Sequence, residues 1–91
     1  MTDQPFPRVR LTRCDLARNM RRFYALSLEP NLFGETTLVR NWGRIGTSGQ
    51  SRLHTFDDPA EAALAFEEWR SLKARKGYVP ETDPHLGGPA S

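Results

Sequence analysis

Residues 58–77, DPAEAALAFEEWRSLKARKG, contain the signals that begin, pattern and end a helix. Asp58 is a favoured N-cap residue, Pro59 suits the first helical position, and Glu61 stands at capping-box spacing. One face repeats apolar side chains with a period of 3.6, namely Ala62, Ala65, Phe66, Trp69 and Leu72. Cations gather in the last turns before Gly77, where the helix dipole favours positive charge. The segment predicts one amphipathic helix that needs a second layer to cover its apolar face.

The residues before this helix predict that the second layer is a sheet. Residues 8–12 and 22–29 alternate polar and apolar side chains, and residues 35–42 are rich in β-branched and aromatic types. A last strand is expected near residues 51–56. The connections are short, which favours an antiparallel meander. The expected fold class is α+β: a twisted antiparallel β-sheet of about four strands with one amphipathic C-terminal α-helix packed on it.

The chain of 91 residues is long enough for one core and too short for two. Residues 1–7 and 80–91 are rich in proline or glycine and have little to bury, so we expect two flexible tails around a domain at 8–79. There is no apolar run long enough to span a membrane and no secretory h-region. The single cysteine, Cys14, excludes an internal disulfide and fits a reducing cytoplasm.

Charge is distributed unevenly along the chain. Residues 1–52 carry nine arginines against four carboxylates, whereas residues 53–91 carry four cations against seven carboxylates. Arginine outnumbers lysine 11 to 2, and its planar guanidinium suits bidentate contact with phosphate. The first half of the chain is therefore the expected side for an anionic partner.

The stretch at residues 41–50, NWGRIGTSGQ, is the most informative for function. Its three glycines allow a hairpin end with positive φ and close backbone approach. It has the spacing of neither a Walker loop nor a dinucleotide fingerprint. An aromatic ring beside a guanidinium can stack on a sugar or base and hold a phosphate, although a plain tight turn would also explain these residues.

These residues resemble the motif of the WGR domain. The match consists of Trp42-Gly43-Arg44-Ile45-Gly46-x-x-Gly49-Gln50, preceded by Asn19-x-x-Arg22-Phe23-Tyr24. Phe56, the helix with Ala62 and Phe66, and Lys73-x-x-Lys76-Gly77-Tyr78 resemble the C-terminal half of the family. The resemblance covers roughly residues 8–79, and the chain is similar to small bacterial proteins that consist of little besides this domain.

The resemblance implies a nucleic-acid-binding module. The domain is best known from DNA-dependent poly(ADP-ribose) polymerases, where its tryptophan packs against the terminal sugar of a DNA end. Neighbouring polar and basic groups there engage the 5′-phosphate, and the arginine joins contacts between domains. Carried onto this sequence, the resemblance implies Trp42 as a stacking platform and Arg44 as the adjacent cation. The other implied contacts come from Asn19, Arg21, Arg22, Gly43 and Gln50.

Several alternatives stay open at the level of sequence. Trp42 could close the core, Arg44 and the cluster around Arg21 could be solvated, and Gln50 could serve the hairpin. If Tyr24 faces the helix, Arg22 shares its side of the strand and Arg21 points away. Cys14 is expected to be a small, partly buried hydrophobe.

We expect a non-enzymatic protein without cofactor or metal, because there is no catalytic triad, nucleotide loop or cluster at metal-ligand spacing. It is expected to be a monomer that binds DNA ends or nicks. The alternative is a non-catalytic protein-interaction module with the same fold.

Overall fold

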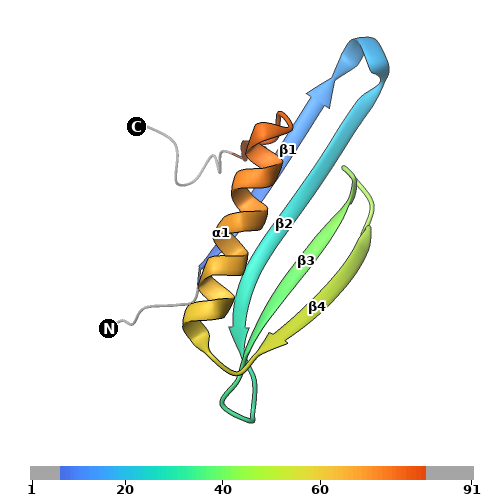
Figure 1. The fold of residues 1–91 in the computed structure, drawn as a ribbon. Coiled ribbons are helices and arrows are strands. Elements are labelled where there is room, and N and C mark those ends of the chain that lie inside the picture. The colour runs from blue at the N-terminus through green and yellow to red at the C-terminus, as the bar shows by residue number, and fades with distance from the viewer. Residues whose placement is uncertain (1–6, 82–91) are drawn as a thin grey trace, which may run out of the picture.

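The computed structural model describes residues 7–81, and in it a helix crosses one face of a twisted sheet (Figure 1). The elements, in order, are β1 (Arg8–Asp15), the 3-10 turn η1 (Leu16–Arg18), β2 (Met20–Pro30), β3 (Thr36–Arg44), β4 (Gln50–Phe56), α1 (Pro59–Arg75) and β5 (Val79–Pro80). The strand order is β4-β3-β2-β1-β5, and every neighbouring pair is antiparallel. The α+β class and the C-terminal helix are confirmed.

The expectation of about four strands needs one correction, because β5 is a fifth. Val79 and Pro80 pair with Thr12 and Leu11 on β1, and the backbone N–H of Glu81 donates to the carbonyl of Arg10 at 2.8 Å. A strand of two residues is too short to show any periodicity in the sequence. The chain therefore stays on the sheet through residue 81, beyond the expected boundary at 79. The rest of the expected tails, 1–6 and 82–91, lies outside the described residues.

The core forms between α1 and the face of the sheet that it covers. Strand side chains alternate between the two faces, so residues two apart on β2 point to the helix together. The buried core side chains are Leu11, Tyr24, Leu26, Leu28, Leu38, Ala62, Phe66 and Tyr78. Ala65 and Trp69 pack against them, half-buried. Four of the five residues of the expected apolar face are thus confirmed, and the fifth, Leu72, is half-buried outside this core cluster.

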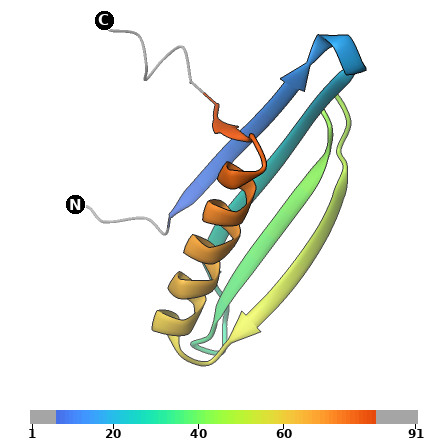
Figure 2. The same cartoon turned by 45° about the horizontal axis from the view of Figure 1, so that its top comes forward.

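The helix begins where its sequence signals place it. Asp58 has extended backbone angles, and its carboxylate accepts a hydrogen bond from the N–H of Ala60 at 2.9 Å. Pro59 occupies the first turn, where a missing N–H leaves no hydrogen bond unmade. The helix runs antiparallel to β4, so its C-terminus returns to the end of the sheet where β1 meets β2 (Figure 2).

The hairpin between β3 and β4 closes against the uncovered face of the sheet. A side chain on Gly49 would place its Cβ 2.2 Å from the carbonyl oxygen of Trp42, and one on Gly43 would lie 2.8 Å from the Cα of Gly49. Only glycine permits this approach. Phe23, which is 2% exposed, packs beneath these two glycines from β2. The positions of these two glycines therefore determine the backbone conformation of the hairpin that carries Trp42 and Arg44.

Candidate nucleic-acid interface

Two rows of side chains run across the strands near the C-terminus of α1. In one row Tyr24 is paired with Leu11 and Trp42, and in the next Arg22 is paired with Arg13 and Arg44. These positions are two apart on each strand, so both rows lie on the face that the helix covers. An aromatic row therefore borders directly on a row of three arginines.

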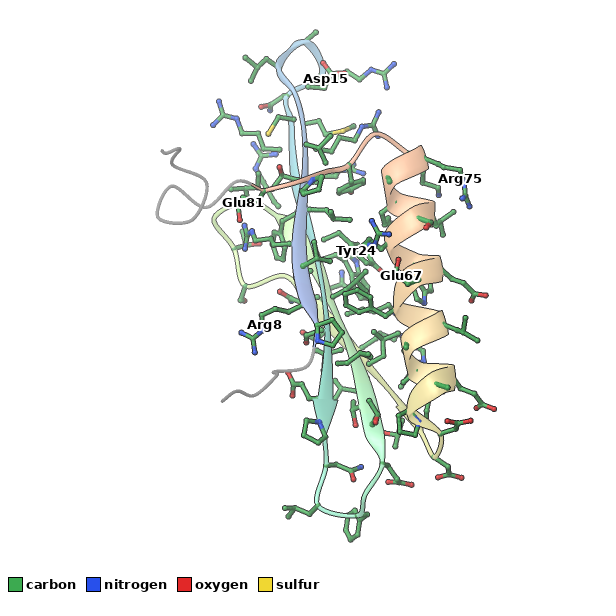
Figure 3. All side chains as sticks on the ribbon, turned by 90° about the vertical axis from the view of Figure 1, so that its left-hand side faces the viewer. Arg8, Asp15, Tyr24, Glu67, Arg75 and Glu81 are labelled. Atoms are coloured by element: carbon green, nitrogen blue, oxygen red, sulfur yellow. The ribbon has the colours of Figure 1, made fainter. Side chains whose placement is uncertain are left out.

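Trp42 stands in the aromatic row with one side packed on the core. Its ring lies 5.9 Å from that of Tyr24 between centroids, at an interplanar angle of 20°. Tyr24 also stacks on Trp69 at 6.2 Å and meets Tyr78 edge-on at 6.3 Å. Trp42 is half-buried, whereas Tyr24 is almost fully buried and points toward the helix (Figure 3). The packed side of Trp42 fixes its ring while part of it stays accessible.

Arg40 contacts three members of this aromatic group, namely Tyr24, Trp42 and Trp69. Its guanidinium lies 4.1 Å from the ring centroid of Trp69 and 5.4 Å from that of Trp42. It donates to the hydroxyl of Tyr24 at 3.0 Å and from Nε to Nε2 of His54 at 3.2 Å. The geometry makes His54 Nε2 an acceptor, so this histidine serves a structural hydrogen bond.

The arginine row is extended by a lysine from the helix. The Nζ of Lys73 lies 4.5 Å from the ring centroid of Tyr24 and 5.6 Å from that of Tyr78. Burial lowers the pKa of Lys73 from its ordinary value, and the nearby charges of Lys76, Arg40 and Arg22 lower that pKa further. The ammonium group of Lys73 is thus partly desolvated and lies close to three other cations.

Within residues 7–81, the arginines of this row have no salt-bridge partner. The three ion pairs formed there use Arg10, Arg18 and Arg70. Arg22 and Arg44 are direct cross-strand neighbours, an arrangement in which like charges destabilise a sheet. Their mutual repulsion would be relieved by an anion placed between them.

A cavity of about 410 Å³ opens at the junction of the two rows. It is lined by the cations Arg22, Arg44 and Lys73 and by the rings of Tyr24, Trp42 and Tyr78. The lining contains no carboxylate among the described residues. Such a cavity can accept a flat or ring-shaped group beside an anionic one.

The structure places four of the seven implied residues at this cavity. Arg22, Trp42, Gly43 and Arg44 all line it. Arg21 pairs with Cys14, so it stands on the opposite face, as the alternation of β2 predicts.

The other two implied residues lie beside the cavity. Asn19 has a left-handed backbone, with φ of 52°, and its carbonyl oxygen accepts a long hydrogen bond of 3.4 Å from Nη1 of Arg44. Gln50 is exposed and offers its carbonyl to Nδ2 of Asn41 at 2.9 Å. The hairpin is thus bridged by the side chain of Asn41, which also donates to the carbonyl of Ser48 at 3.0 Å.

Sequence reasoning did not assign Arg13, Arg40, Lys73 or Tyr78 to the site. Lys73 and Tyr78 belong to the matching segment Lys73-x-x-Lys76-Gly77-Tyr78, whose lysines the sequence places in the last turn of the helix, where the dipole favours cations. A Cβ built on Gly77 would lie 3.2 Å from Nε of Arg13, which puts that arginine beneath the end of the helix. Arg13 and Arg40 are brought to the site by the strand register, and the sequence contains no local signal for that register. Cys14 is exposed, so the expectation of partial burial was wrong.

Residues 7–81 contain no group of three or more side chains suited to hold a metal ion. No helix in that range is long and apolar enough to cross a membrane.

Comparison with known proteins shows the family. The family model described as WGR domain matches residues 8–85. An uncharacterized protein of Sinorhizobium fredii, y4dW, is 46% identical over 80 residues, which are 88% of this chain and 39% of that protein. Protein YehF of Escherichia coli is 44% identical over 41 residues, or 45% of this chain and 15% of YehF. The chain therefore spans well under half the length of these relatives.

A solved structure shows the same fold. A crystal structure of a Bacteroides fragilis protein superposes with a TM-score of 0.71 over 84% of this chain and 20% of the other, at 24% sequence identity. At that identity the likeness concerns the fold alone.

Proposed function

The chain belongs to the WGR family, and on that premise we propose that it binds DNA ends or nicks at the cavity beside Trp42, with a preference for a 5′-phosphate. The family includes nucleic-acid-binding modules of poly(ADP-ribose) polymerases, and the WGR domain itself is non-catalytic. The role is therefore binding without turnover.

The convergence of cations on an aromatic cavity carries the proposal. Arg22, Arg44 and Lys73 surround one opening, and no described carboxylate lines it. A phosphate there would gain charge-assisted hydrogen bonds from planar guanidinium groups and would offset the repulsion between the two arginines. The pKa of Lys73 is lowered first by burial and then by the charges of Lys76, Arg40 and Arg22, so other cations lie near this lysine.

The neighbouring aromatic row suits the sugar or base attached to that phosphate. Trp42 is held from behind by Tyr24 and Arg40, so its ring is already oriented before a ligand arrives. Stacking on an oriented ring loses little side-chain entropy. A cavity of about 410 Å³ accommodates one terminal nucleotide, and an uninterrupted duplex presents no free terminus to enter it. This favours ends and nicks over continuous duplex.

The test is fluorescence anisotropy with a short labelled duplex whose ends are 5′-phosphorylated, 5′-hydroxyl or closed by hairpins. We expect the tightest binding to the phosphorylated duplex, and a steep loss of affinity between about 50 and 200 mM salt. Arg44→Ala should weaken binding, whereas Arg8→Ala, a matched change outside the cavity, should not. Equal binding of all three duplexes would contradict end recognition.

A role in protein interaction has separate support. Leu32 and Phe33 are 98% and 85% exposed at the turn between β2 and β3, far from the cavity. Purification from native cells after nuclease treatment distinguishes the two roles, because a stoichiometric protein partner would survive and a nucleic-acid-bridged one would not.

A further inference from the structure

The turn between β2 and β3 presents two large apolar side chains to solvent. Leu32 and Phe33 are the two most exposed large hydrophobic residues among those described. The turn between β2 and β3 forms one tip of the molecule (Figure 1), whereas the residues of β2 and β3 that line the cavity lie at the other ends of these strands. The two adjacent side chains form one contiguous exposed apolar patch, and such patches mark contact surfaces.

The turn is ordered by its own hydrogen bonds. The side-chain oxygen of Asn31 accepts from the N–H of Phe33 at 2.8 Å and from that of Glu35 at 3.0 Å. Nδ2 of Asn31 donates to the carboxylate of Glu35 at 2.9 Å, and the N–H of Asn31 donates to the carbonyl of Glu35 at 2.9 Å. The apolar pair is therefore held in place, which lowers the entropy lost when it docks.

This tip is surrounded by negative charge. We define the acidic end as residues 29–36 and 56–61, which carry five carboxylates and no cation: Glu29, Glu35, Asp57, Asp58 and Glu61. We define the basic end as residues 13–22, 43–50 and 73–78, which carry eight cations and one carboxylate. The two ends have opposite charge, and the basic end contains an aromatic cavity.

We propose that this protein associates head to tail, with Leu32 and Phe33 of one copy docking in the cavity beside Trp42 of a second copy. The apolar pair meets Tyr24, Trp42 and Tyr78, and Glu29 and Glu35 face Arg22 and Arg44. In each contact one copy thus supplies an apolar tip with carboxylates, and the other supplies an aromatic cavity with cations. The association departs from the expected monomer and needs no nucleic acid.

The two surfaces lie on different ends, so one contact leaves a free tip and a free cavity. Such a heterologous contact repeats from copy to copy and gives open chains, or rings where the rotation between copies closes, and the mean size grows with concentration. The same cavity is the one we propose for nucleic acid, so a DNA end would dissociate the chains. This last point alone rests on the proposed function.

The test is sedimentation velocity of the full chain over a range of concentrations, at low and high salt, without nucleic acid. We expect the mean mass to rise with concentration at low salt and to fall when salt screens the charges. Leu32→Ser/Phe33→Ser should weaken association at least about tenfold. Leu16→Ser/Leu64→Ser, which changes two other exposed leucines, should associate like the wild type.

Mixing two defective variants makes the test specific. Arg22→Glu/Arg44→Glu changes only exposed side chains and removes the cavity's attraction, so this variant should also be monomeric. Mixed with Leu32→Ser/Phe33→Ser it should form a dimer that grows no further, because one protein retains a tip and the other a cavity. A wild-type monomer at every concentration, or a mixture that stays monomeric, would overturn the proposal. If the wild-type protein associates with itself but binds no DNA, only the proposed function is refuted.

Discussion

The acidic end and the basic end of this molecule are formed by the same sheet and helix. They differ in whether their charged side chains have a partner within the protein. The acidic end uses part of its charge locally, since Asp58 caps the helix and Glu35 bonds within its turn. At the basic end, Arg22 and Arg44 repel each other across two strands and have no acidic partner within residues 7–81. Charge that serves the fold is paired locally, and charge left unpaired around a cavity points to a ligand.

Of the changes considered, charge reversal at the basic end should have the largest effect, and the quantity that it changes is the affinity for DNA. Arg22→Glu/Arg44→Glu is expected to lower affinity for a 5′-phosphorylated duplex by at least about 100-fold at low salt, because two phosphate partners become repulsive. Glu29→Lys/Glu35→Lys, at the acidic end, should leave that affinity unchanged or slightly increase it. Anisotropy titrations measure both. Equal losses in the two variants would mean that net charge, not the cavity, governs binding.

Trp42→Ala should reduce both binding and stability. Loss of a stacking platform is expected to cost about 1–3 kcal/mol of binding free energy. Because the ring also stacks on Tyr24, removing it should lower the free energy of unfolding by about 1–3 kcal/mol, less than for a fully buried tryptophan. Trp42→Phe should recover most of the stability. A sharp stability loss with unchanged DNA affinity would assign Trp42 to the core alone.

Arg40→Met tests whether this arginine positions the aromatic row. The change removes hydrogen bonds to Tyr24 and His54 and two cation–π contacts, so we expect a loss of about 1–3 kcal/mol in the free energy of unfolding. Arg52, the cross-strand partner of Arg40, is exposed, and Arg52→Met is the matched control. Denaturant unfolding distinguishes the two. Equal stability in both variants would show that the contacts around Arg40 contribute little.

The titration of Lys73 gives a pH dependence of known sign. Its folded pKa lies below its ordinary value of 10.5, so below the folded pKa its charge costs stability. That contribution should diminish as pH rises through the folded pKa toward 10.5, because the unfolded chain then binds more protons. An anion in the cavity should raise the pKa. NMR titration of Lys73, with and without inorganic phosphate, measures both shifts, and a pKa equal to that of an exposed lysine would contradict them.

The smallest expected effect is at the acidic end. Asp58→Ala removes the hydrogen bond to the N–H of Ala60 and should lower the free energy of unfolding by about 1 kcal/mol. DNA affinity should not change, since the cap lies at the opposite end from the cavity. Thermal unfolding and anisotropy on the same sample check both statements. A change in DNA affinity would show that the two ends are coupled.

The sequence predicted those elements whose signals are local. The helix from Pro59 follows from its cap and its apolar period, and the strands follow from their alternation. The two-residue strand β5 was missed because its pairing with β1 is a contact between distant segments. Likewise, sequence motifs indicated Trp42 and Arg44, while Arg13 and Arg40 became visible only through the register.

By itself the sequence determined the fold class, the helix limits and the glycine hairpin that mounts Trp42, because backbone preference and periodicity act between near neighbours. Only the tertiary structure decided which cations share a surface. It joined Lys73 from the helix to Arg22 and Arg44 on the strands, and it collected opposite charges at opposite ends. These outcomes depend on strand register and on helix packing, which follow from burial of the whole core.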